Sequence, residues 1–525
     1  MVERVSLREA PEGEVVGFSR ALKISRGSVE EWLRLVEDAM RTSLKSALRH
    51  GYIALEASLL GAVRQASASL QTVLRDTRLN AEARTEALVE VGESMLASLG
   101  EERAVWMASS FAQVASLAAE IMWTAGTEEA LIVQAGGTYR ATAPPASVMF
   151  STASSGPATR TNSGGGFKVT PASAGASAPS VSFASASTPP RLRTESSGSA
   201  AGSPSASDAP HWRAVLNATG AEGFAAGSFS SPLLAWLVRV KAELAALTAL
   251  VQTPMPPLQR KCVVAILIAG VHARDVVQRL LDDRVAGREA FQWQSQLRMY
   301  LEPESGQVLA RHALCTLPYG FEYEGCSARL VITPLTERCW LTLSTAMRLR
   351  LGAAPAGPAG TGKTESSKDL AKALGVQCVV FNCSEQLNYA TLSRIFAGLA
   401  QTGAWACLDE VNRLHVEVLS VVSVMLSVIR RGRLAGAERI QFEGRSIPLR
   451  DHHVVITYNP DYSGRTELPD NLKALFRPCA MVLPDSSAIA EVMLASEGFL
   501  TSHSLASRVT RLYDLARQQL SVQAH

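Results

Sequence analysis

The sequence predicts an α/β fold for its last third: a parallel sheet with helices on both faces, preceded by a mostly helical region. Two observations carry this prediction. After about residue 329, short apolar runs alternate with helical stretches, a pattern typical of a parallel sheet that is covered on both sides. Before that point, apolar residues recur at helical spacing, first over residues 29–48. The chain has 525 residues, which is enough for two or three domains.

The strands of the sheet are expected at the apolar runs that helical stretches separate. Four of these runs cover residues 374–382, 404–408, 454–458 and 480–483, and an apolar segment at 341–351 precedes a glycine-rich motif. We therefore expect a five-stranded αβα sandwich within residues 329–485, with the glycine-rich motif between a strand and a helix.

Residues 1–135 are expected to be mostly helical. Ser28 and Glu31 form a capping box, which marks the start of the first helix. Further helical patterns cover about 52–76, 80–98 and 104–122. The apolar stripe of the first helix predicts that it packs against a partner helix.

Residues 136–210 differ in composition from the sequence on either side. Ser, Ala, Gly, Thr and Pro dominate them, so the segment buries too little apolar area to offset the entropy lost on ordering. We expect a disordered insertion here. Helical patterns resume in residues 211–325, and they cover 233–251, about 258–284 and about 287–300.

The composition argues against several classes of partner. Lys and Arg number 51 and Asp and Glu 48, and a net charge of +3 gives no reason to expect nucleic acid. None of the eight cysteines forms a Cys-x-x-Cys pair, which fits a reducing compartment. The longest strongly apolar run, 263–271, is too short to cross a bilayer. We therefore expect an intracellular protein that binds neither nucleic acid nor membrane.

A phosphate-binding loop is predicted at residues 357–364. They match the pattern G-x-x-x-x-G-K-[ST] without departure, as Gly357, Pro358, Ala359, Gly360, Thr361, Gly362, Lys363 and Thr364. The glycines let backbone N–H groups surround phosphates at the start of the next helix. Lys363 is expected to contact the β- and γ-phosphates and Thr364 to bind Mg²⁺, so the predicted cofactors are ATP and Mg²⁺.

An acidic pair follows the apolar strand at 404–408. Asp409 and Glu410 stand 46 residues after Lys363, a suitable distance for the third strand of a P-loop core. Asp409 is expected to hold Mg²⁺, and Glu410 to orient the water that attacks the γ-phosphate. The sequence therefore predicts an ATPase rather than a glycine-rich turn.

Asn459 stands at the end of the apolar run 454–458. A polar residue at the tip of a strand between the phosphate strand and the acidic strand corresponds to sensor 1 of AAA+ ATPases, which contacts the γ-phosphate or the attacking water. The alternative is an Asn-Pro turn, because Pro460 follows. The two other motifs favour the sensor.

These motifs lie in segments that closely resemble the first AAA+ module, AAA1, of dynein heavy chains. The resemblance runs from about Tyr319 to His525 and includes GAAPAGPAGTGKTE, KDLAKALGVQCVVFNCSEQLNY, GLAQTGAWACLDEVNRLHVEVLSVV and GRTELPDNLKALFRP. Upstream, VEEWLRLVEDAM, EIMWTAGTEEAL, VHARDVV and FQWQSQLRMY resemble the C-terminal half of the dynein linker. The resemblance implies an α/β AAA+ P-loop core at 326–525, with linker-like helices at 1–135 and 211–325.

The resemblance also implies function, residue by residue. Glu410, Lys363 and Asn459 would be catalytic, Thr364 and Asp409 would hold Mg²⁺, and Leu330, Val331 and Ile332 would form the loop that flanks adenine. In a full-length parent the module would drive minus-end-directed movement on microtubules. The implied partners are the other AAA+ modules of the ring, dynein intermediate and light chains, and microtubules. The implied location is the cytoplasm and cytoskeleton, and family frequency favours the axoneme of a cilium or flagellum.

The sequence departs from the family pattern in one residue and in extent. Val411 replaces the phenylalanine of the family's Asp-Glu-Phe-Asn-Arg, which alters packing but no reacting group. The chain ends at His525, before the expected sensor-2 arginine, so we expect a fragment or a truncated gene product. Two alternatives stay open: a fragment that holds Mg-ATP without efficient turnover, and an AAA+ ATPase unrelated to motility.

Overall fold

The computed structural model describes most of the chain outside one long central segment. The described residues are 4–9, 14–23, 29–75, isolated positions between 94 and 107, and 110–520 except 137–230, 303–304, 327, 385, 461–466 and 500. The predicted helix at 80–98 lies outside them except for two positions, and the predicted insertion at 136–210 lies outside them except for Gly136.

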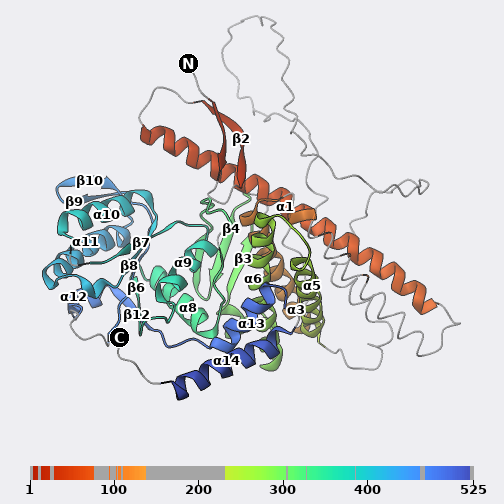
Figure 1. The fold of residues 1–525 in the computed structure, drawn as a ribbon. Coiled ribbons are helices and arrows are strands. Elements are labelled where there is room, and N and C mark those ends of the chain that lie inside the picture. Colours follow the sequence, from red (N-terminus) through yellow and green to blue (C-terminus); the bar gives the residue numbers. More distant parts are fainter. Residues whose placement is uncertain are drawn as a thin grey trace, which may run out of the picture. The chain divides into compact units, whose positions relative to one another are not determined.

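The five-stranded parallel sheet is confirmed, and it forms the centre of the C-terminal module (Figure 1). Its strands are β6 (Gly352–Ala356), β7 (Cys378–Asn382), β8 (Trp405–Asp409), β11 (Val454–Ile456) and β12 (Phe476–Ala480). The strand order is β12-β6-β11-β8-β7, and every pairing is parallel. Strand β11 therefore lies between β6 and β8, and the C-terminal ends of these three strands meet at one edge.

Helices cover both faces of the sheet because alternate strand residues point to opposite sides. Ala353, Cys407 and Val455 join one apolar core, and their neighbours Ala354, Ala406 and Val454 join the other. The first core includes α8 (Pro334–Arg348) and α9 (Lys363–Ala373), and the second includes α10 (Tyr389–Thr402) and α11 (Val416–Leu434). The result is a three-layered αβα sandwich.

Two of the predicted strands are wrong in position. The apolar segment 341–351 is mostly helix α8, whose start is capped by the Thr333 side chain, and the strand before the glycine-rich loop is the shorter β6. The strand predicted at 480–483 is β12, which pairs along its whole length with β6. Val482 and Leu483 lie beyond it and are 61% and 64% exposed. Apolar composition alone therefore misplaced both strands.

Four long helices make up most of the described residues before the module. They are α1 (Val29–Arg75), α3 (Ala112–Gln134), α5 (Pro232–Val251) and α6 (Pro257–Asp282). Helix α1 begins at the predicted place and continues unbroken through the second predicted pattern. Trp236 of α5 packs against α3 where Gly126 leaves room, since a Cβ on this glycine would stand 2.2 Å from the indole ring.

This region also contains strands, which the sequence-based prediction of helices through residue 325 missed. Strands β1 (Arg4–Glu9) and β2 (Val15–Lys23) form an antiparallel pair. The predicted helix at 287–300 is wrong, because only the single turn α7 (Phe291–Gln294) is helical there and strand β3 (Leu297–Leu301) follows. Strands β3, β4 (Val308–His312) and β5 (Cys315–Pro318) form an antiparallel sheet.

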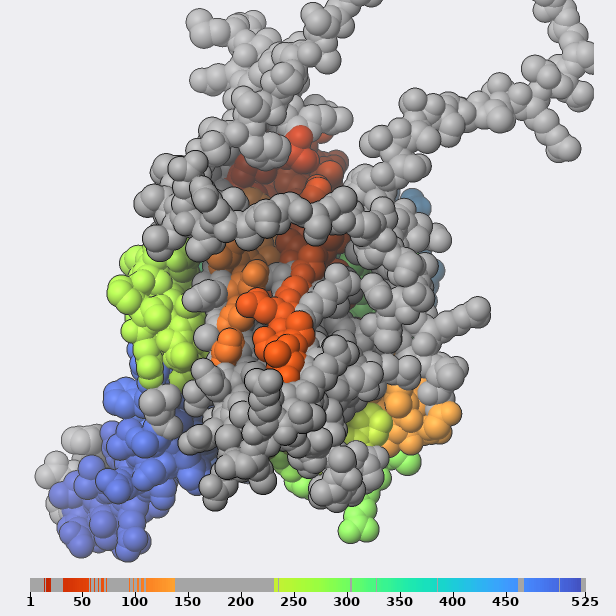
Figure 2. Space-filling view, turned by 90° about the vertical axis from the view of Figure 1, so that its right-hand side faces the viewer, coloured from red at the N-terminus to blue at the C-terminus, as the bar shows by residue number. Residues whose placement is uncertain are grey.

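The helical region and the module share one apolar core. It runs from α1, α3 and α6 through β3 and β4 to α8 and α9. At the C-terminal end, α13 (Ser486–Ser496) and α14 (Ser502–Gln519) follow the sheet. Gln252, just after α5, donates a hydrogen bond of 2.7 Å to the carbonyl of Gly498, and Figure 2 shows the blue C-terminal helices beside yellow-green residues of the α5–α6 pair.

Three smaller elements complete the module. They are the antiparallel pair β9 (Arg439–Phe442) and β10 (Arg445–Pro448), and the short helix α12 (Asp470–Lys473). Among the helices that the structure describes, none is long and apolar enough for a bilayer crossing.

Candidate ATP-binding site

The glycine-rich loop connects β6 to α9 at the C-terminal edge of the sheet. Gly360 and Gly362 have φ values of 76° and 80°, in the left-handed region that glycine adopts at no steric cost. The buried Thr361 hydroxyl donates a hydrogen bond of 3.0 Å to the carbonyl of Pro358, which folds the loop on itself. A Cβ on Gly360 would have no atom within 4 Å, so this side of the loop faces open space.

Lys363 and Thr364 open helix α9. The Lys363 ammonium donates hydrogen bonds to the carbonyls of Gly357 and Pro358, at 2.9 and 2.7 Å. The Thr364 hydroxyl donates to Asp409 Oδ1 at 2.6 Å. Asp409 is the last residue of β8, so this bond joins the first turn of the phosphate-loop helix to the acidic strand. The sequence-predicted Mg²⁺ ligands, 45 residues apart, therefore lie in direct contact.

Glu410 lies at a strained turn just after β8. Its φ is 53°, in the left-handed region that non-glycine residues rarely adopt. The Thr457 hydroxyl accepts a hydrogen bond from the Glu410 backbone N–H at 3.0 Å and donates to Asp409 Oδ1. The Glu410 carboxylate itself pairs with Arg413 in the following 3₁₀ turn.

Thr457 was not among the predicted site residues, although it is fully buried between the two acidic positions. It follows β11 directly, and the Val411 N–H donates to its carbonyl at 2.9 Å. A hydroxyl residue inside an otherwise apolar run, two positions before Asn459, was the signal available in the sequence. Its importance depends on contacts with Asp409 and Glu410, which lie 48 and 47 positions away in the sequence.

Asn459 lies beside the glycine-rich loop. The preceding residue, Tyr458, forms a parallel bridge with Ala356 at the end of β6, and its carbonyl accepts from the Gly357 N–H at 3.3 Å. The carbonyl of Asn459 accepts a hydrogen bond of 3.0 Å from the Asn412 side chain. The predicted sensor residue is thus at the strand tip between β6 and β8, next to the loop rather than on a remote turn.

The predicted adenine-flanking segment, Leu330 to Ile332, precedes helix α8. Val331 and Ile332 are partly buried and pack against the apolar core that includes α8 and α9. The Leu330 backbone N–H donates to Asp369 Oδ1 on α9 at 3.2 Å. This segment is therefore attached to the helix that begins with Lys363.

The thiols near the site are poor nucleophiles. Burial, with a smaller contribution from the Asp409 carboxylate, raises the pKa of Cys383 to about 12. Burial also raises the pKa of Cys407 in β8 far above its usual value. These two groups are protonated near neutral pH and serve as small apolar side chains.

The residues present fit a Mg²⁺–nucleoside triphosphate. A hydroxyl and a carboxylate in contact supply the oxygen ligands that Mg²⁺ prefers, and the loop offers backbone N–H groups and a lysine at a helix N-terminus, where phosphates bind. The parallel sheet, the loop and the acidic strand together define a P-loop ATPase of the AAA+ class.

Comparison with known proteins identifies the module more narrowly. Residues 319–525 match the family model for the hydrolytic ATP-binding site of the dynein motor region. The chain is 54% identical to human dynein axonemal heavy chain 6 over 284 residues, and 50% identical to mouse dynein axonemal heavy chain 1 over 306 residues. It is 46% identical over 280 residues to the 1-beta heavy chain of the flagellar inner arm I1 complex of Chlamydomonas reinhardtii.

These matches cover 54%, 58% and 53% of the chain but only 7%, 7% and 6% of the three relatives. Residues 319–525 are therefore similar to the ATP-hydrolysing AAA+ module of dynein heavy chains, and the chain spans only a small part of the relatives it matches.

Proposed function

We propose that residues 319–525 bind one Mg-ATP and hydrolyse it at the C-terminal edge of the sheet. The observation that carries this proposal is the hydrogen bond between Thr364 and Asp409, because it joins the two predicted Mg²⁺ ligands beside the phosphate loop. Bound Mg²⁺ would neutralise charge on the phosphate oxygens and orient the triphosphate.

Each predicted site residue has a role in this reaction. Backbone N–H groups of 357–364 bind the phosphates, and Lys363 turns from the loop carbonyls to the β- and γ-phosphates. Glu410 orients the attacking water and accepts its proton. Asn459 contacts the γ-phosphate or that water. Leu330, Val331 and Ile332 contact the adenine. The bond from the γ-phosphorus to the bridging oxygen breaks as the bond to the water oxygen forms.

A second candidate function is nucleotide binding without efficient turnover. The observation that favours it is the ion pair between Glu410 and Arg413, since the carboxylate would have to leave this partner to contact an attacking water. In related phosphoryl-transfer enzymes an arginine supplied by a partner accelerates turnover by roughly 10³–10⁵. We therefore expect slow turnover by the chain alone.

A thermal-shift titration beside a phosphate-release assay separates these functions. The wild-type chain is expected to unfold at a higher temperature in Mg-ATP, and to release phosphate slowly but measurably under single-turnover conditions. Stabilisation without phosphate release would favour the second candidate. No stabilisation by Mg-ATP at any concentration would contradict both.

We further propose that the chain belongs to a microtubule motor. The relatives named as axonemal and flagellar dynein heavy chains support this proposal. In a full-length parent, other AAA+ modules would complete the ring, intermediate and light chains would bind elsewhere, and the motor would move along microtubules of the axoneme. Residues 1–135 and 211–325 would then belong to the linker. Sedimentation of a longer parent chain with axonemal microtubules, released by ATP, would test this proposal.

Thr457→Val should slow phosphate release while leaving Mg-ATP binding largely intact. Valine keeps the shape of threonine but removes the hydroxyl that is hydrogen-bonded to both Asp409 and Glu410. The part-buried Glu410 N–H then loses its acceptor. An unmade buried hydrogen bond costs about 1–3 kcal/mol, so single-turnover release should fall by about tenfold or more. Thr457→Ser, which keeps the hydroxyl, should restore most of the rate. Equal rates in wild type and Thr457→Val would show that this hydroxyl does not position Glu410.

A further inference from the structure

A buried carboxylate outside the predicted site connects the adenine-flanking segment to the phosphate-loop helix. Asp369 lies on α9, six residues after Lys363, and is only 3% exposed. Its Oδ1 accepts two hydrogen bonds of 3.2 Å, one from the Leu330 backbone N–H and one from the Arg329 Nε. Both donors lie at the start of the segment that leads into α8.

The same arginine reaches the helical region. Arg329 donates from its terminal nitrogen to Glu120 Oε1 of α3 at 3.2 Å, and the two side chains are 13% and 21% exposed. Burial alone would lower the pKa of the Arg329 guanidinium, but the carboxylates of Asp369 and Glu120 outweigh this effect and raise the pKa. The arginine therefore stays charged, and it connects α3 to α9.

The second carboxylate oxygen of Asp369 raises the free-energy cost of burying this side chain. Oδ2 is buried and accepts no hydrogen bond from the residues that the structure describes. A buried carboxylate with an unpaired oxygen is expensive compared with an apolar residue of similar size. Such a group at this position is better explained by a positioning role than by stability alone.

We propose that Asp369 is a positioning residue that sets the adenine-flanking segment against the phosphate loop. The inference rests on the proposed function of this site. Through Oδ1, one carboxylate fixes Leu330 relative to the helix whose first turn carries Lys363 and Thr364, so the adenine and phosphate contacts are held in register. Arg329 extends this connection to Glu120, and thus to the helical region.

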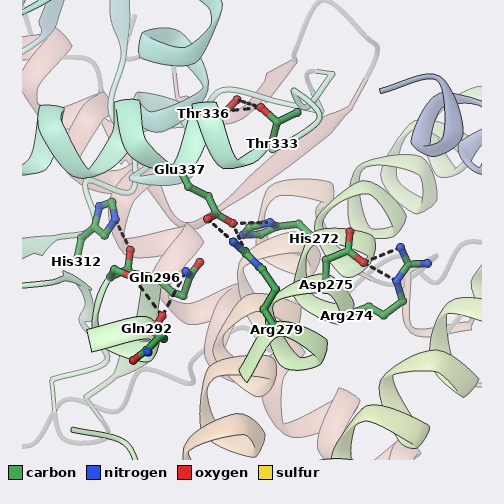
Figure 3. Close-up of polar contacts among 11 residues, drawn as sticks. His272, Arg274, Asp275, Arg279, Gln292, Gln296, His312, Thr333, Thr336 and Glu337 are labelled. Atoms are coloured by element: carbon green, nitrogen blue, oxygen red, sulfur yellow. Dashed lines mark hydrogen bonds and ion pairs between the residues drawn. The ribbon is translucent and has the colours of Figure 1, made fainter. Parts of the chain in front are cut away.

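A second ionic contact between the helical region and the module provides a matched control. Glu337 in the first turn of α8 accepts hydrogen bonds from both terminal nitrogens of Arg279 and lies 3.5 Å from His272 Nδ1, both on α6 (Figure 3). Like Asp369, Glu337 is a carboxylate that pairs with an arginine. It follows the adenine-flanking segment closely in the sequence. The described side chains that its carboxylate contacts, however, are both on α6, so it does not connect that segment to α9.

The test compares two probes, Mg-ATP and Mg-tripolyphosphate, on the full chain. Both occupy the phosphate loop, but only ATP carries adenine. Asp369→Ala removes the acceptor for both Leu330 and Arg329. We expect this variant to bind ATP roughly 30–150-fold more weakly than the wild-type chain, which corresponds to a loss of about 2–3 kcal/mol in binding free energy. Tripolyphosphate binding should change by less than about twofold. Asp369→Asn, which keeps an acceptor oxygen but loses the charge, should show a smaller selective loss and serves if the alanine variant does not fold.

Three results would overturn the inference. They are unchanged ATP binding by both Asp369 variants, equal loss of both probes, and the same selective loss of ATP in the control Glu337→Gln. Failure of the wild-type chain to bind either probe would instead reject the proposed function, and the inference with it. A selective loss of ATP in the Asp369 variants alone supports the positioning role.

Discussion

Lys363→Ala should abolish the stabilisation of the chain by Mg-ATP. At ATP about 100-fold above its dissociation constant, binding should stabilise the wild-type fold by roughly 2.7 kcal/mol. Lys363 stands at the N-terminus of α9 and its ammonium already contacts the phosphate loop, through the carbonyls of Gly357 and Pro358. Alanine removes the charge that would face the β- and γ-phosphates. Thermal unfolding with and without Mg-ATP measures the effect.

Lys368→Ala is the matched control for this experiment. Lys368 lies on the same helix, but it pairs with Glu365 on the exposed side, so its loss should leave the Mg-ATP shift intact. The unfolding temperatures without nucleotide show whether either substitution weakens the fold itself. If Lys363→Ala kept the full shift, the phosphate-loop assignment would be wrong.

Glu410→Gln should separate binding from turnover. Glutamine keeps the shape of the side chain and leaves Thr364 and Asp409 in contact, so Mg-ATP should still stabilise the fold. It cannot accept a proton from the attacking water, and the loss of a positioned general base typically costs 10²–10⁴ in rate, so turnover should fall by about this factor. Single-turnover phosphate release, measured beside the thermal shift, gives both quantities.

Glu417→Gln controls for the loss of a carboxylate from the segment that follows Glu410. Glu417 is exposed in the first turn of α11. Its replacement should change neither the stabilisation by Mg-ATP nor the rate of phosphate release. A Glu410→Gln chain that released phosphate at the wild-type rate would show that another group activates the water. One that no longer bound Mg-ATP would show that Glu410 supports the site rather than the chemistry.

The contiguous parts of the candidate site could be predicted from the sequence. The phosphate loop is a run of eight residues whose pattern fixes its own geometry, and Asp409 and Glu410 follow directly from an apolar strand. Asn459 could be placed because a polar residue at the end of an apolar run marks a strand tip. The loop and the acidic pair are local signals that depend on neighbours along the chain, whereas the choice of a sensor over a turn at Asn459 also used those two motifs.

The residues that support the site could not be predicted in this way. The roles of Thr457 and Asp369 depend on contacts with residues 48 and 39 positions away in the sequence. Nothing near Asp369 indicates that its carboxylate is buried, since it lies in a polar helix with charged neighbours. Such contacts become visible only when the strand order and the packing of α8 and α9 are known.

The misplaced elements have a related cause. Strand β6, Gly352–Ala356, is short and rich in alanine, so the apolar helix before it gave a stronger signal. Strand β3 does not alternate buried and exposed residues, and its Arg298 is buried although it is charged. The two terminal nitrogens of Arg298 donate hydrogen bonds to Tyr300 and Gln294, and a search for periodic apolar residues does not detect such contacts.

We propose that Thr364 and Asp409 form the magnesium site of an ATP bound to the loop at 357–364. A crystal structure of the chain grown with Mg²⁺ and a non-hydrolysable ATP analogue tests it most directly. We expect the triphosphate along the loop, and a metal ion bonded to the Thr364 hydroxyl at about 2.1 Å, with Asp409 in direct or water-mediated contact. A triphosphate bound elsewhere, or a metal ion remote from both residues, would show that Thr364 and Asp409 do not form this magnesium site.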